Sequence, residues 1–442
     1  MKAKNSLVDS IYNIYSKYNN RSWLLSRFIN AISWGIIGTI FSKASLFISN
    51  IIIARVLGTT QYGEYSIINS TINLFASFAG VGLGLTAVKY VAEFKSKDLK
   101  KTGDIISVTL LFSILTGFLM MVAVFFLSDF ISQYILSAQH INPILKISAP
   151  MLLFFTVTGV LTGIIQGLEL FKSLAVINIG TGFISLLLVT VGVYFYGIIG
   201  VVVANVIIQF IILVIFAYVV FNELRKRKIN LSFVKSRTEY RVLLKFSFPA
   251  FVSNVLVVPV IWIGHSILVN QPNGYSELGV FNAAYQWQTI LLFIPTVIGT
   301  SITPIMSERF GNGDIQAVRK STKIIMALSI FIVVPIAIAL SSISPWIMGQ
   351  YGEEFTSGWK VLTIVLITVC VMSIQMPVGN LITASGKMWA GLGLNGAWAF
   401  LFLTSFAFLK TYGAIGMALS LLVAYTFHTV WSTIIAFSIV KR

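Results

Sequence analysis

Charged residues and cysteines are scarce in this sequence. Only 10% of its 442 residues are charged, and Cys370 is its one cysteine. A single thiol can form neither an intrachain disulfide nor a thiolate metal cluster, which excludes both as sources of stability. Hydrophobic residues make up 57% of the chain, a composition that lies outside the soluble range and indicates an integral membrane protein.

Sequence motifs of several protein classes are also absent. No G-x-x-x-x-G-K-[ST] motif occurs, because Gly386 and Lys387 are followed by Met388, and this excludes a P-loop ATPase. The sequence contains no H-E-x-x-H motif, no paired carboxylates within one loop and no large extramembrane domain, and loop 93–103 lacks the G-x-x-x-D-R signature of major facilitators. We therefore expect neither an enzyme nor a cofactor.

Long apolar runs predict an all-α polytopic membrane protein. About 20 apolar residues suffice to cross a bilayer, and only helices or closed barrels can do so. The runs are continuous and of helical length, unlike the ten-residue alternation of a barrel. Hydropathy predicts about twelve transmembrane spans, at residues 28–54, 64–92, 104–127, 143–169, 173–194, 197–221, 242–269, 277–306, 319–345, 357–384, 388–409 and 412–438.

The basic residues predict the orientation in the membrane. Lys and Arg gather in the first 27 residues and in alternate loops, whereas the loops 128–142, 195–196, 270–276 and 346–356 contain none. Because cytoplasmic loops carry the excess of Lys and Arg, we expect both termini in the cytoplasm, at the cell membrane. The net charge of +17 therefore does not indicate nucleic-acid binding. The polar segment 1–27 is no cleavable signal peptide; it is an interfacial helix or a solvated tail.

An internal repeat divides the chain into halves. A shift of 216 positions places Gly63 on Gly279, Asp98 on Asp314 and Gly197 on Gly413. Each half has an even number of spans, so both enter the membrane from the same side and form a parallel repeat. We predict a cytoplasmic N-terminal segment 1–27, a six-helix lobe 28–221, a basic linker 222–241 and a second six-helix lobe 242–442, with the substrate between the lobes.

Lys43 stands near the middle of the first span. A lysine at that depth costs about 2.5 to 3.5 kcal/mol, so it is a functional candidate by default. Arg55 and Lys89 flank the same pair of helices at opposite ends. Each of these two alone is explained by snorkelling to the membrane surface. The three cations together suit an anion that crosses the membrane.

Uncharged polar residues accompany these cations on the predicted helices. Each of them could bind substrate or have a purely structural role. The structural alternative is an interhelical hydrogen bond for the asparagines, packing for the tryptophan and an interfacial hydrogen bond for the histidine. The full set of candidate substrate-binding residues is Lys43, Arg55, Lys89, Asn50, Asn69, Asn73, Trp262, His265, Asn282 and Gln286.

Four segments of the sequence resemble a known family. IIIARVLGTTQYGEYSIINSTINLF (51–75), GVGLGLTAVKYVAEF (80–94), ELGVFNAAYQ (277–286) and TPIMSERFGNGD (303–314) are similar to the oligosaccharide-exporting flippases of the MOP superfamily, which also contains the MATE multidrug exporters. The resemblance implies a MATE-like, V-shaped pair of lobes around a cationic cavity. It also implies alternating-access transport of undecaprenyl-pyrophosphate-linked repeat units of O-antigen of lipopolysaccharide, capsule or exopolysaccharide, from the cytoplasmic to the outer leaflet.

The resemblance also implies partners and roles. The partners are a polyprenyl-pyrophosphate-linked oligosaccharide, membrane lipids, a polysaccharide polymerase and a chain-length regulator, with no nucleic acid. Lys43 would anchor the pyrophosphate, with Arg55 and Lys89 as exit and entry contacts. Two alternatives stay open: a multidrug exporter of the same superfamily, although the first span lacks the acidic residue such exporters use, and a non-transporting scaffold for polysaccharide assembly. The sugars carried and the energy source also stay open.

Overall fold

The computed structural model describes residues 3–80, 82–232 and 256–440, and within these ranges the chain is helical, with no strand. The first half contains α1 (Ala3–Gly80), α2 (Leu83–Phe94), α3 (Leu99–Phe130), η1 (Ile131–Ile135), η2 (Gln139–Ile141), α4 (Asn142–Ser148), α5 (Pro150–Gly167) and α6 (Phe171–Lys226). The second half contains α9 (Val257–Val269), α10 (Gly274–Leu291), α11 (Phe293–Gly311), α12 (Ile315–Ser342), α13 (Ser344–Gly349), η5 (Glu353–Gly358), α14 (Trp359–Ala384), α15 (Met388–Leu409), η6 (Lys410–Tyr412) and α16 (Gly413–Ile439).

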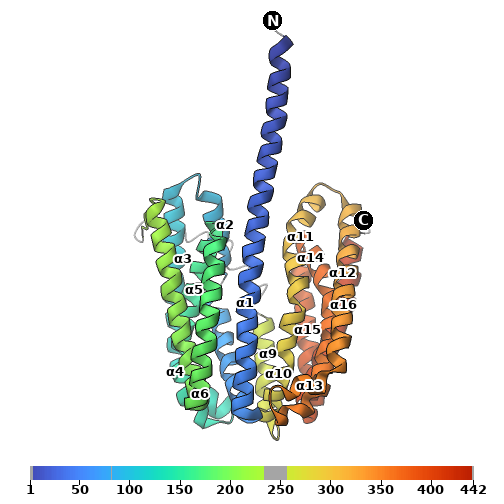
Figure 1. Ribbon diagram of the computed structural model, residues 1–442. Coiled ribbons are helices and arrows are strands. Elements are labelled where there is room, and N and C mark those ends of the chain that lie inside the picture. The colour runs from blue at the N-terminus through green and yellow to red at the C-terminus, as the bar shows by residue number, and fades with distance from the viewer. Residues whose placement is uncertain (1–2, 81, 233–255, 441–442) are drawn as a thin grey trace.

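The helices form two bundles. Helices α1 to α6 make the N-terminal bundle and α9 to α16 the C-terminal bundle, and the long α1 stands at the edge of its bundle that faces the other (Figure 1). At the lower end of that view, α9 and α10 of the C-terminal bundle lie next to α1. A shared hydrophobic core joins the bundles there and includes Tyr62, Phe281 and Phe355. The predicted all-α, two-lobed architecture is confirmed.

The helices have the length and composition of membrane spans. Among the described residues, seven helical segments are long and apolar enough to cross a bilayer. Three of them, Gly38–Gly80, Phe171–Lys226 and Trp389–Ile439, exceed 40 residues, which at about 1.5 Å per residue is enough to cross twice. Helix α9 and the pair α10–α11 correspond to the two remaining predicted spans. The protein is therefore a multi-pass membrane protein.

Three predicted helix boundaries differ from the structure. Spans 64–92 and 277–306 are each broken in two, the first at Gly82 with φ 68° and the second just before Pro295, which has no N–H for the helical hydrogen bond. Helix α1 begins at Ala3, so the N-terminal segment is a direct extension of the first span rather than a separate interfacial helix or a tail (Figure 1). Part of the predicted linker and of span 242–269 lies outside the described residues.

The repeat recurs in local backbone structure. Asp98 caps α3 by accepting a hydrogen bond from the N–H of Lys101 at 2.9 Å, and Asp314 caps α12 in the same way through Ala317 at 3.1 Å. Gly197 and Gly413 have nearly the same backbone angles, φ 55° and ψ −138° against φ 57° and ψ −132°. A positive φ favours glycine, which explains why both positions hold it. Residues 216 positions apart thus have the same structural role, which confirms the parallel repeat.

Candidate functional site

Polar contacts join the two bundles around the break in α1 at Gly58. Glu354 of η5 accepts hydrogen bonds from the backbone N–H of Thr59 at 3.1 Å and from its hydroxyl at 3.0 Å. Ser276 donates to the Thr59 hydroxyl at 2.9 Å. Nearby, Ser137 donates to Asn270 at 2.6 Å. We call this region, defined by these five residues, the closed end.

Two glycines allow the bundle backbones to touch at the closed end. A Cβ atom added at Gly63 would overlap the carbonyl oxygen of Tyr275, and one added at Gly279 would overlap that of Thr59. Gly63 and Gly279 match in the repeat, and so do Thr59 and Tyr275, so the contact is reciprocal about an approximate two-fold axis. Small residues permit such close approach of helices within membranes.

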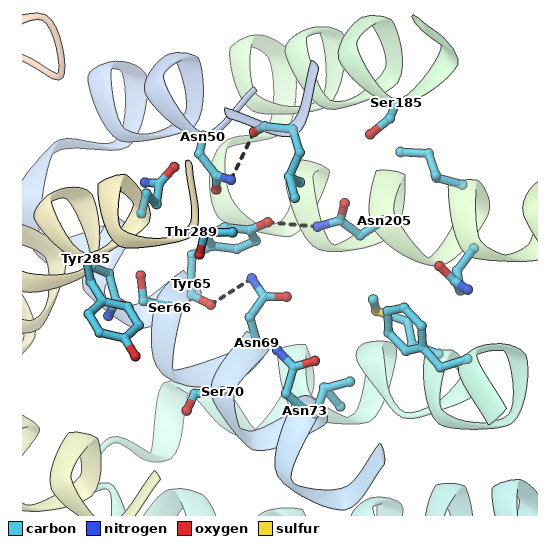
Figure 2. A pocket seen from close by; sticks show the side chains of 18 of the residues that line it. Asn50, Tyr65, Ser66, Asn69, Ser70, Asn73, Ser185, Asn205, Tyr285 and Thr289 are labelled. Carbon is cyan, nitrogen blue, oxygen red and sulfur yellow. Dashed lines mark hydrogen bonds between the residues drawn. The ribbon is translucent and has the colours of Figure 1, made fainter. Parts of the chain in front are cut away.

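A cavity of about 700 Å³ lies between the bundles beside the closed end, lined by residues of α1, α5, α6, α9 and α10 (Figure 2). None of its described lining residues carries a charge. Hydroxyl groups and seven amide side chains supply its polarity, and the amides are Asn50, Asn69, Asn73, Asn205, Gln209, Asn282 and Gln286. The described lining therefore differs from the cationic cavity that the sequence resemblance implies.

Three predicted residues make hydrogen bonds between the bundles. Gln286 donates to the Tyr62 hydroxyl at 2.7 Å, and His265 Nδ1 shares a 2.9 Å hydrogen bond with the Ser70 hydroxyl. Trp262 Nε1 donates to the Thr71 hydroxyl at 3.0 Å. Gln286 and His265 line the cavity, whereas Trp262 is not among its lining residues. Trp262 thus forms a bridge between the bundles outside the described cavity lining.

The predicted asparagines also line the cavity. Asn50, Asn69 and Asn282 each donate to the carbonyl four residues earlier, at 3.0, 3.2 and 3.1 Å, so these hydrogen bonds lie within helices and not between them. An amide has two N–H donors and a carbonyl oxygen, and one such bond leaves two of these groups for a ligand. Asn73 is exposed and points into the same space (Figure 2).

The three predicted cations are not brought together. Lys43 is half-buried beside the lining residue Ser42, and its Nζ lies 6.0 Å from the centre of the Phe293 ring of α11. Arg55 and Lys89 are exposed, and neither these two nor Lys43 is among the described residues that line the cavity. The structure distributes positive charge along α1 and α2 outside the cavity.

The sequence prediction missed part of the lining. Asn205 donates to the Tyr65 hydroxyl at 3.0 Å (Figure 2), and Gln209 follows one helical turn later on α6. A signal was present, because these two amides, four residues apart, interrupt an otherwise apolar span and so share one helix face. Tyr62 and Tyr65 carried no comparable signal, since tyrosine is common at membrane–water interfaces and both lie at or next to the end of a predicted span.

The carboxylate of Glu354 at the closed end makes the contact between the bundles sensitive to pH. The hydrogen bond from the Thr59 backbone N–H, followed by that from its hydroxyl, holds the pKa of Glu354 below its usual range. A lowered pKa means that the carboxylate stabilises the closed end above its ordinary pKa and that this contribution is lost as pH falls through the lowered value.

We therefore expect acidification to loosen the closed end. Spin labels on the exposed positions Tyr134 and Trp346, one on each bundle, should report longer distances as the pH falls below the pKa of Glu354. Cys370→Ser removes the native thiol, and Glu354→Gln is the matched variant that should abolish the pH response. An unchanged response in Glu354→Gln would assign it to another group.

Comparisons with known proteins agree with this architecture. Residues 28–310, more than half of the chain, match the family described as Polysaccharide biosynthesis protein. The chain belongs to this family. Residues 249–409 also match the MatE family.

A relative from Ralstonia solanacearum, the EPS I polysaccharide export inner membrane protein EpsE, is 20% identical over 408 residues, covering 90% of this chain and 91% of the relative. Its counterpart from Ralstonia nicotianae is 22% identical over 194 residues, 43% of this chain and 44% of the relative.

Solved structures show the same fold. The inward-facing conformation of a multidrug resistance MATE family transporter of the MOP superfamily has a TM-score of 0.77 at 13% identity, over 92% of this chain and 99% of that one. An outward-facing conformation of such a transporter has a TM-score of 0.68 at 14% identity, over 93% and 96%. A MOP superfamily transporter from Pyrococcus furiosus has a TM-score of 0.68 at 13% identity, over 94% and 96%. These structures confirm the predicted MATE-like fold, and the family matches together with the EpsE relative confirm the predicted resemblance to the MOP superfamily.

Proposed function

We propose that this protein is a flippase. It carries a polyprenyl-pyrophosphate-linked oligosaccharide, a repeat unit of a surface polysaccharide, from the cytoplasmic to the outer leaflet of the cell membrane by alternating access, with both termini in the cytoplasm. The observation that carries the proposal is the uncharged polar cavity of about 700 Å³ between two bundles that touch at one end. The family match and the EpsE relative, named for polysaccharide export, support it.

The chemistry of the cavity suits this cargo. Amide and hydroxyl groups can exchange hydrogen bonds with sugar hydroxyls, while the polyprenyl tail stays in the lipid. The outer surface of both bundles is apolar and includes the exposed side chains of Phe195 and Phe331, so the apolar tail can lie against it. The pyrophosphate needs positive charge. Lys43, half-buried and next in the chain to the lining residue Ser42, is the group we assign to it, with Lys89 and Arg55 as contacts toward either surface.

The role of Lys43 gives the first functional prediction. Lys43→Gln should lower flipping at least about tenfold, because a charge-assisted hydrogen bond to phosphate is worth about twice a neutral one. Lys43→Arg should keep part of the activity, since it keeps the charge but not the shape of an ammonium. The measurement is the amount of lipid-linked glycan that accumulates inside cells carrying each variant at equal protein level.

Normal surface polysaccharide in Lys43→Gln cells would contradict the anchor role. It would also leave room for a scaffold that contributes to assembly, beside a polymerase and a chain-length regulator, without transport. Full activity of a deletion strain in glycan display would contradict the proposed function as a whole.

A second candidate function is favoured by the MatE match and by the structural likeness to multidrug transporters. Drug susceptibility of a deletion strain separates the two. A flippase mutant should lose glycan display and keep its resistance to unrelated cationic drugs, whereas an exporter mutant should do the reverse.

A further inference from the structure

Two side chains that bridge the bundles have unused hydrogen-bonding atoms. Gln286 donates through Nε2 to Tyr62, and its Oε1 is buried without a partner among the described residues. His265 is only 5% exposed, and its Nδ1 is bonded to Ser70 while Nε2 is buried with no described partner. Buried polar atoms without partners are unfavourable, so each of the two atoms gains by pairing when its side chain turns toward a ligand in the cavity that both residues line.

These atoms belong to a lining of one chemical kind. Both residues line the cavity from the C-terminal bundle, and Asn69 and Asn205 line it from the N-terminal bundle. No described lining residue offers a countercharge to an anion or a cation. An ionised carboxylate buried there would lose hydration and gain hydrogen bonds but no countercharge from the described lining, which is unfavourable. A hydroxyl or acetamido group would be satisfied by the amides around it.

From this we infer, resting on the proposed function, that the cavity selects uncharged sugar units over sugar acids, and that Gln286 and His265 are specificity-determining contacts. Both atoms are buried in this state, so the contacts form when the side chains turn toward the cavity. Gln286 Oε1 then accepts a hydrogen bond from a sugar hydroxyl, and His265 Nε2 pairs with a second hydroxyl, as donor or acceptor according to its tautomer. The pyrophosphate stays outside this cavity. Recognition of the phosphate and of the sugar is thereby divided between two places.

The test compares two synthetic substrates in proteoliposomes that contain the purified protein. Both are undecaprenyl-pyrophosphate disaccharides, and they differ only in that one glucose is replaced by glucuronic acid. Because the lipid and the pyrophosphate are the same in both, the ratio of the two flipping rates depends on the sugar alone. We expect the neutral substrate to be flipped at least about tenfold faster, given the penalty for burying an unpaired charge.

Three variants locate the selectivity. Gln286→Leu should slow the neutral substrate about tenfold, because it leaves a sugar hydroxyl unpaired. Gln271→Leu is the matched control. Gln271 follows α9, donates to the Ile267 carbonyl of that helix and does not line the cavity, so the same change there should leave the rate unchanged. Asn282→Lys adds a cation to the lining and should raise the rate of the glucuronate substrate relative to the neutral one. That gain cannot come from misfolding.

Each outcome has a distinct meaning. Equal rates for both substrates in the wild type would overturn the selectivity and leave the flippase proposal intact. Movement of neither substrate would count against the flippase proposal itself. A Gln286→Leu protein that folds and flips the neutral substrate as fast as Gln271→Leu would overturn the assigned contact. If Gln286→Leu does not fold, the wild-type ratio and its change in Asn282→Lys still decide the inference.

Discussion

Oxidation of a Thr59→Cys/Ser276→Cys pair is expected to stop transport, and reduction to restore it. The two hydroxyl oxygens that the thiols replace are 2.9 Å apart and belong to different bundles. Such neighbours lie close enough for a disulfide, which requires Cβ atoms about 3.5 to 4.5 Å apart. A bond there fixes the closed end. Transport should fall at least about tenfold, because a protein confined to one of two states cannot complete a cycle.

The controls separate locking from damage. Each single cysteine variant, and the reduced double variant, should transport, all in a Cys370→Ser background. Ser344→Cys/Thr363→Cys is the matched pair, since these hydroxyls are 3.4 Å apart within the C-terminal bundle. Its oxidation should leave transport unchanged. Complete cross-linking of Thr59→Cys/Ser276→Cys with full transport would show that the bundles need not separate at this end.

The fold was predictable because its local signals are repeated. Asp98 and Asp314 cap equivalent helices, and Gly197 and Gly413 have matching positive φ angles, so one shift along the chain aligned features that each have a physical cause. Hydropathy averages over a window and therefore missed the break at Gly82, which depends on a single backbone conformation. Hydropathy likewise says where a span is apolar and not where its helix begins, and α1 is already helical from Ala3, before the span predicted at Phe28.

The sequence indicated many of the residues that line the cavity but not how they are arranged. Amides in apolar helices are rare enough to be noticed, and Asn69, Asn282 and Gln286 do line the cavity. The sequence shows the depth of a residue, whereas its direction depends on how each helix is rotated against the other bundle. Trp262 finds Thr71 as a partner 191 residues away, and the Lys43 nitrogen lies 6.0 Å from a ring of α11. Neither contact leaves a periodic signal.

The glycine contact at the closed end leads to the second large expected effect. Replacing glycine by alanine inside a helix normally stabilises it by about 0.5 to 1 kcal/mol. Gly180 on α6 has open space where a Cβ would lie, so Gly180→Ala should follow this rule. Gly63→Ala and Gly279→Ala should do the opposite, because each new methyl group overlaps a backbone carbonyl of the other bundle.

We expect Gly63→Ala to separate the bundles at the closed end and to lower transport at least about tenfold, since a gate that does not seal removes one of the two states that alternate. Labels at Tyr134 and Trp346 measure the separation. The two glycines share one contact, so adding Gly279→Ala to Gly63→Ala should cost much less than the sum of the two single effects. If Gly63→Ala behaved like Gly180→Ala in both measurements, the glycine contact would have no part in closing the transporter, and the Thr59, Ser276 and Glu354 hydrogen bonds would have to hold the bundles together by themselves.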